Sequence, residues 1–125
     1  MFGSYEVYTH GGRKGAGLDP VKFAVQMEKM GAGEIMINAI DRDGSMAGYD
    51  IDLIKRVANS VTIPIIACGG MGKLADIVAA TDEGNASAAA AGSYFVYHGK
   101  RRAVLINFPT QDELNVLFQE YHQAA

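Results

Sequence analysis

Two aspartates are the residues of this chain whose spacing best suits acid–base chemistry. Asp41 and Asp43 follow the apolar run 34–40, and Asn38 and Ser45 flank them as candidate substrate contacts. On an extended backbone, residues two apart share a face, with Cα atoms about 6–7 Å apart. Carboxylates that close push their pKa values apart, so one of them can transfer a proton near neutral pH. The alternative is a loop in which both carboxylates cap backbone N–H groups, and the spacing alone favours that loop.

Two glycine motifs follow the next two apolar runs and suggest an anion site. Gly69 and Gly70 follow run 62–67, and Gly92 and Ser93 follow run 86–91. Glycine lets an anion approach exposed backbone N–H groups, so we expect phosphate there. A lone glycine pair is more typical of a tight turn, but its repetition after the next run favours phosphate.

Alternating strands and helices are expected to position these residues. Strands are predicted at 5–9, 34–40, 62–67 and 86–91, and helices at 20–30, from 51, at 74–81 and from 111. Asp19 and Asp50 are expected to cap the first two helices, and 110–113 is expected to form a capping box before the last. The run 86–91 is alanine-rich and would favour a helix by propensity, but its position between a turn and a glycine indicates a strand. Alternation of this kind predicts an α/β fold: a parallel sheet with helices outside and ligands at the carboxyl ends of the strands.

Other residues carry weaker signals. A glycine-rich cationic loop is predicted at 10–17, His10 and His98 are expected in loops, and His122 is expected on the solvent side of the last helix. Cys68 is expected to be a small buried residue, and the six methionines are expected to fill the core. We expect no metal site and no cofactor, because the spacing of these residues gives no metal-ligand set.

Length and composition limit the possible functions. A complete (β/α)8 barrel takes about 250 residues, whereas this chain has 125 residues, of which 49% are hydrophobic and 20% charged. A formal net charge of −3 argues against a nucleic-acid surface, and the basic run 100–102 is too short to change that. The single cysteine, the absence of a signal-peptide pattern and the absence of any apolar run near 18 residues predict a soluble cytoplasmic protein that does not enter a membrane.

Segments 31–48 and 63–72 resemble the cyclase subunit of imidazole glycerol phosphate synthase, and the resemblance continues to the C-terminus. It implies that Asp43 is an acid–base residue with Asp41 as its supporting neighbour, and that Gly70, Gly92 and Ser93 bind one of two substrate phosphates. Glu34 matches a charged residue at the barrel floor, where ammonia from a glutaminase partner enters. Segments 5–10, 95–99 and 102–109 are closer to the branch linked with acetamidino modification of polysaccharide sugars.

The chain departs from this family in length. The resemblance places the second catalytic aspartate and the second phosphate site in an N-terminal half that has no counterpart here. We therefore expect one domain, 1–125: a half-barrel matching the C-terminal half of a TIM barrel, with two free sheet edges. Open edges and an open inner face favour a homodimer. Three functions remain: a phosphate-binding homodimer without full cyclase activity, a cyclase or amidotransferase subunit that needs a complementing half or a glutaminase partner, and a fragment without its own function.

Overall fold

Three parallel strands form the centre of the molecule. The computed structural model describes residues 5–99 and 101–124, and its main sheet has the order β3-β4-β5. The strands are β3 (Ile35–Asn38), β4 (Ile65–Cys68) and β5 (Ala88–Ala89). Asn38 lies opposite Cys68, and Ala67 lies opposite Ala89. The prediction of a parallel α/β sheet is confirmed, including a strand within the alanine-rich run.

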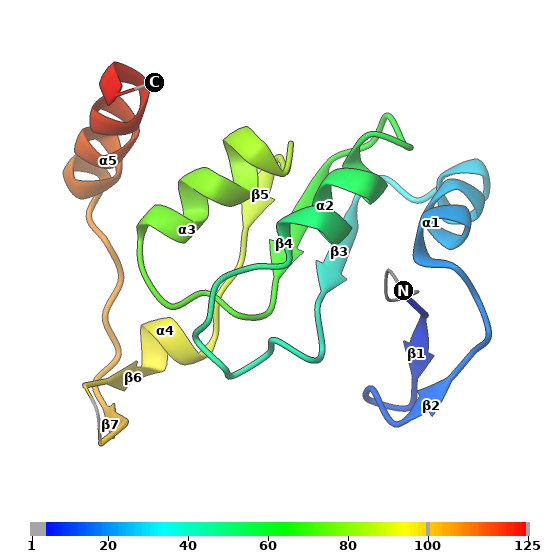
Figure 1. The fold of residues 1–125 in the computed structure, drawn as a ribbon, viewed down its shortest axis with the longest axis horizontal. Helices are drawn as coiled ribbons and strands as arrows, with labels where there is room; N and C mark the ends of the chain where they lie inside the picture. Colours follow the sequence, from blue (N-terminus) through cyan, green and yellow to red (C-terminus); the bar gives the residue numbers. More distant parts are fainter. Residues whose placement is uncertain (1–4, 100, 125) are drawn as a thin grey trace.

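The helices include one after each of the three parallel strands, as the alternation predicts (Figure 1). They are α1 (Pro20–Lys29), α2 (Ile51–Ala58), α3 (Ala75–Val78), the π-helix η1 (Ala79–Glu83), α4 (Ser93–Val96) and α5 (Gln111–Ala124). Asp19 caps α1 by accepting a hydrogen bond from the Lys22 N–H at 2.9 Å, and Asp50 caps α2 through the Leu53 N–H at 3.1 Å. Both caps were expected, since an Asp side chain at this position accepts from the first free N–H groups of a helix.

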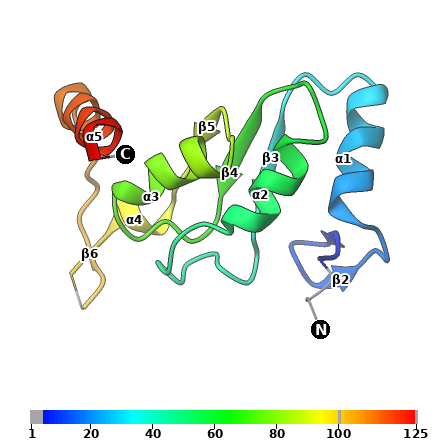
Figure 2. The ribbon, with the colours of Figure 1, turned by 45° about the horizontal axis from the view of Figure 1, so that its top comes forward.

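The two faces of the sheet have different surroundings. Ile65 and Ala67 of β4 pack against the helices with 1% and 0% exposure, together with Val57 of α2 at 0%. The turned view shows α2 and α3 in front of the strands (Figure 2). On the opposite face Met36 is 56% exposed and Asn38 is also exposed. The described chain therefore covers one face of the sheet and leaves the other open.

Two antiparallel hairpins flank this sheet, and the alternation did not predict them. Segment 5–9 forms a strand only at β1 (Tyr8–Thr9), which pairs with β2 (Lys14–Gly15) and not with the parallel strands. The expected fourth strand beside the barrel strands is therefore wrong, and part of the expected 10–17 loop is a strand. A second hairpin, β6 (Tyr97–His98) and β7 (Ala103–Val104), follows α4. The predicted helix at 74–81 instead ends as a π-helix.

Helix α5 lies apart from the sheet and contacts α3 and η1 (Figures 1 and 2). The expected capping box is present, because the Glu113 N–H donates to Thr110 Oγ1 and Glu113 Oε2 accepts from the Thr110 N–H at 2.7 Å. His122 is exposed as expected, but its Nε2 lies 2.6 Å from Asp82 Oδ2. This contact holds the Asp82 pKa below its usual value.

The methionines do not all fill the core. Met71 is 3% exposed, whereas Met30 and Met36 are 73% and 56% exposed. The expectation is wrong for these two because Met30 ends α1 and Met36 points to the uncovered face of the sheet.

Candidate functional site

The loops that follow the three parallel strands meet at one edge of the sheet. The Ala39 N–H donates to the Cys68 carbonyl at 3.1 Å, and the Gly48 N–H donates to the Gly70 carbonyl at 2.8 Å. The Tyr49 hydroxyl donates to the Ala90 carbonyl at 2.9 Å. These bonds join the loop after β3 to the loops after β4 and β5. The predicted site residues therefore come together at the carboxyl ends of the strands, as expected.

Asp41 and Asp43 lie in a turn, 40–45, and not on extended backbone. The Asp43 N–H donates to the Ala39 carbonyl at 3.0 Å, and the Ser45 N–H donates to the Arg42 carbonyl at 2.9 Å. The expectation that both carboxylates share the face of a strand is therefore wrong. The strand ends at Asn38, and Gly44, with a φ of +73°, lies near the end of the turn.

The two carboxylates have different neighbours. Asp41 lines a cleft beside β3. Asp43 faces the end of β4: burial raises the pKa of the Cys68 thiol, and the negative charge of Asp43 raises it further. Cys68 is half-buried rather than buried, because its side chain points to the uncovered face of the sheet. Asp43 is thus the aspartate nearer the predicted anion site.

Gly69 and Gly70 are required by backbone packing. Both are buried, with φ values of +86° and +109°. A Cβ at Gly69 would lie 2.6 Å from Asn38 Oδ1, and one at Gly70 would overlap the Gly48 carbonyl oxygen. Positive φ angles and close contacts with the loop after β3 therefore account for both glycines. Phosphate binding by the same residues stays a prediction.

Gly92 and Ser93 have more room around them. Gly92 is exposed, and a Cβ placed on it would meet no atom within 4 Å. Ser93 begins α4, and its Oγ would lie 3.9 Å from a Cβ on Gly44. The structure therefore places Ser93 beside the turn that carries Asp41 and Asp43, with open space next to Gly92.

Sequence reasoning did not single out two residues that organise these loops. Asp76 is 9% exposed, and its Oδ2 accepts from the Gly72 and Lys73 N–H groups at 2.8 and 3.0 Å. Arg102 Nη2 donates to the Gly44 carbonyl at 2.9 Å across 58 residues. Asp76 lies four and three residues after Gly72 and Lys73, so this contact is local in sequence, whereas nothing local points from Arg102 to Gly44.

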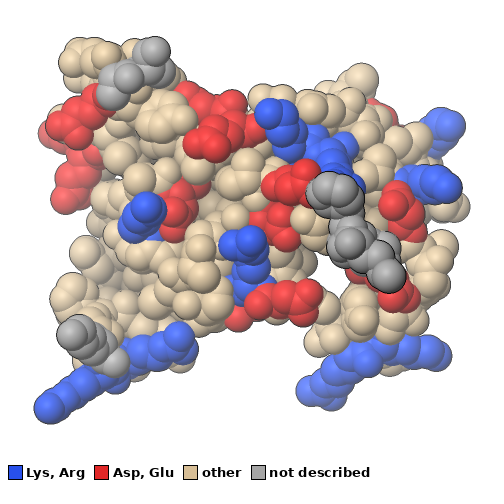
Figure 3. Space-filling view, in the orientation of Figure 1, with Lys and Arg blue, Asp and Glu red and all other residues tan. Residues whose placement is uncertain are grey.

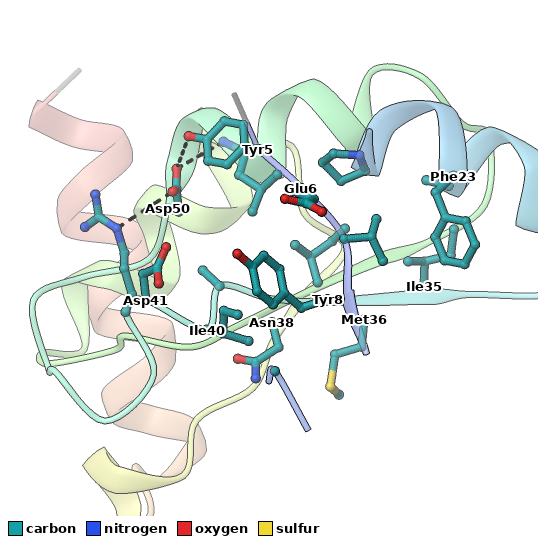
Figure 4. A pocket seen from close by; sticks show the side chains of 18 of the residues that line it. Tyr5, Glu6, Tyr8, Phe23, Ile35, Met36, Asn38, Ile40, Asp41 and Asp50 are labelled. Carbon is teal, nitrogen blue, oxygen red and sulfur yellow. Dashed lines mark hydrogen bonds and ion pairs between the residues drawn. The ribbon is translucent and has the colours of Figure 1, made fainter. Parts of the chain in front are cut away.

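A cleft of about 580 Å³ runs along β3. Its walls are β3, the β1–β2 hairpin, α1 and the start of α2. Tyr5 lies at its rim, and its hydroxyl donates to Asp50 Oδ1 at 2.9 Å (Figure 4). Burial and this hydrogen bond raise the pKa of Tyr5 to about 12. Among residues 5–99 and 101–124, β3 ends the sheet, and the cleft runs along the edge that pairs with no described strand.

Within residues 5–99 and 101–124, no three His, Cys, Asp or Glu side chains are grouped so that they could hold a metal ion. The helices of that part of the chain are also too short or too polar to cross a membrane.

In parallel α/β folds whose loops gather at the strand carboxyl ends, ligands usually bind at that edge. The family of histidine biosynthesis proteins matches residues 2–102. The chain belongs to this family, which confirms the resemblance seen in its motifs.

Two curated relatives illustrate the match. The chain is 43% identical over 116 residues to a Pseudomonas aeruginosa protein named putative imidazole glycerol phosphate synthase subunit hisF2, covering 93% of this chain and 46% of the relative. It is 52% identical over 92 residues to the imidazole glycerol phosphate synthase subunit HisF of Hyphomonas neptunium, covering 74% of this chain and 36% of the relative. The chain thus spans less than half the length of these relatives.

Proposed function

We propose that this chain is a half-barrel of the imidazole glycerol phosphate synthase cyclase type that binds phosphate at its strand carboxyl ends and self-associates. The observation that carries the proposal is the meeting of turn 40–45 with Ser93 and the open space beside Gly92. A phosphate or sugar phosphate bound there would accept hydrogen bonds from backbone N–H groups and the Ser93 hydroxyl. Asn38 and Ser45, both exposed near this edge, are proposed substrate contacts.

Without a complementing half, the chain is proposed to lack full cyclase activity. Asp43 is the proposed acid–base residue and Asp41 its neighbour, yet proton transfer in a cyclisation needs a second positioned group. The residues that lie near Asp43 at this edge include the Cys68 thiol, whose raised pKa keeps it protonated at neutral pH. We expect no turnover when the chain alone is given the cyclase substrate and ammonia.

The cleft along β3 favours a second candidate function. A free strand edge inside a cleft is a place where another extended segment can pair. A complementing barrel half would fit such an edge, and a glutaminase partner would then supply ammonia for synthesis of imidazole glycerol phosphate or an acetamidino sugar. Turnover that appears only when these partners are added would favour this candidate.

Replacing Gly92 by valine tests the phosphate site more cleanly than replacing Gly70. Gly92 has a φ of −106°, and a Cβ added to it would have no atom within 4 Å, so the valine variant should fold while its side chain fills the approach of the anion. We expect inorganic phosphate, titrated by calorimetry, to bind this variant about tenfold or more weakly.

Gly33→Val is the matched control, because a Cβ at Gly33 also meets open space and Gly33 lies at the opposite end of β3. It should bind phosphate like the unaltered chain. Equal affinity in all three proteins would place the site elsewhere. Turnover by the chain alone near the rate of a full-length cyclase, abolished by Asp43→Asn, would refute the proposed lack of activity.

A further inference from the structure

The β6–β7 hairpin places a positive charge over the turn that carries the two aspartates. Arg102 lies in this hairpin, and its Nη2 donates to the Gly44 carbonyl at 2.9 Å. Gly44 in turn lies next to Ser93, whose Oγ would be 3.9 Å from a Cβ on that glycine. Arg102, Gly44 and Ser93 therefore follow one another across the edge where we propose that phosphate binds.

Further contacts join the segment that follows the hairpin to α4. The Leu105 N–H donates to the Val96 carbonyl at 2.9 Å, and the Asn107 N–H donates to the Phe95 carbonyl at 2.9 Å. The rings of Phe95 and Phe108 lie 4.9 Å apart. Since Phe95 and Val96 belong to α4, which begins at Ser93, the hairpin and Ser93 are parts of one packed unit.

A cation here would offset the repulsion that Asp41 and Asp43 exert on a bound phosphate. The nearby Arg42 is directed elsewhere: its Nη1 lies 3.4 Å from the Gly48 carbonyl oxygen and its Nε 3.9 Å from Asp50 Oδ2. Arg102 uses one N–H donor on Gly44, and a guanidinium has five. Basic side chains also gather at the two lower corners of the molecule, where the hairpins lie (Figure 3).

We propose that Arg102 is a phosphate-binding residue, whose guanidinium binds the anion next to Ser93. This inference rests on the proposed phosphate site and adds to it a side-chain ligand. A planar guanidinium can donate two parallel hydrogen bonds to a phosphate, which makes arginine well suited to this position.

The experiment compares phosphate binding by the unaltered chain, Arg102→Ala, Arg102→Lys and Arg101→Ala. Arg101 is the matched control, because it is an exposed arginine of the same hairpin tip. We expect Arg102→Ala to weaken inorganic phosphate binding about tenfold, Arg102→Lys to weaken it less, and Arg101→Ala to change it less than about twofold. The salt dependence of binding should also fall in Arg102→Ala, because one fewer charge contacts the anion.

A merely structural role for Arg102 would give a different pattern. Loss of the Gly44 contact alone would lower the melting temperature without phosphate and leave the salt dependence unchanged, which would refute the proposal. Unaltered affinity in Arg102→Ala would also refute it while leaving the phosphate site intact. If the unaltered chain does not bind phosphate, the proposed site itself fails, and the role of Arg102 fails with it.

Discussion

At the residue scale, Asp41 and Asp43 lie in one turn but have different neighbours. Asp41 lines the cleft beside β3, whereas the charge of Asp43 acts on Cys68 at the end of β4. The two carboxylates therefore have different surroundings, and they do not share one face of a strand as their spacing suggested. An acid–base role for Asp43 rests on its position over the strand ends.

The rate at which Cys68 is alkylated tests whether Asp43 lies near this thiol. The negative charge of Asp43 raises the thiol pKa, so Asp43→Asn should lower that pKa and increase the thiolate fraction at pH 8. Because burial is the larger cause, we expect alkylation by iodoacetamide to accelerate only about two- to threefold. The rate is measured by mass spectrometry over time. Asp41→Asn is the control, and an equal acceleration in both variants would contradict the geometry.

At the element scale, close backbone contacts between loops hold the site edge together. Gly70 packs against the Gly48 carbonyl, and Gly72 approaches the Met46 carbonyl in the same way. Asp76 also stabilises the loop after β4, because its carboxylate accepts hydrogen bonds from the Gly72 and Lys73 N–H groups. The glycines after β4 therefore shape the loop whether or not an anion binds.

Replacing Gly70 by alanine should destabilise the fold. Its φ of +109° disfavours any side chain, and the added Cβ would overlap the Gly48 carbonyl oxygen. We expect the free energy of unfolding to fall by about 3 kcal/mol. Urea denaturation measures the change. Gly33→Ala, with open space at the same atom, should change it by less than about 0.5 kcal/mol, and a Gly70→Ala variant as stable as this control would contradict the packing argument.

At the scale of the whole molecule, the sheet has more apolar surface than its own helices cover. Met36 points away from the helices with 56% exposure, and β3 and β5 each end the sheet. The segment after β7 adds exposed side chains, with Ile106 at 67% and Phe108 at 63%. Apolar surface of this kind favours association with a second copy or a complementing half.

We expect the chain to form a dimer of twice 13.3 kDa, measured by sedimentation equilibrium at micromolar concentration. Met36→Asp places a charge on the uncovered face and should shift the equilibrium toward monomer by about tenfold or more. Val116→Asp is the control, because Val116 is 51% exposed on α5, away from the sheet. A monomeric unaltered chain, or equal dissociation in both variants, would contradict dimerisation through this face.

The sequence by itself determined the local features of this protein. Caps at Asp19 and Asp50, the capping box at Thr110 and the strand at 88–89 could be predicted, because helix ends and buried strands depend on residues close in the chain. The order of strands and helices then indicated a parallel sheet with its chemistry at the carboxyl ends. The motifs also indicated the family.

Only the tertiary structure decided how the candidate site is assembled. The contact of Arg102 with Gly44 spans 58 residues, and no local pattern encodes it. The turn at 40–45 gives Asp41 and Asp43 different neighbours, and the close approach of Gly70 to Gly48 shows why glycine is needed at position 70. The two hairpins were not predicted, because a strand of two residues has almost no periodic pattern and its formation depends on the strand with which it pairs.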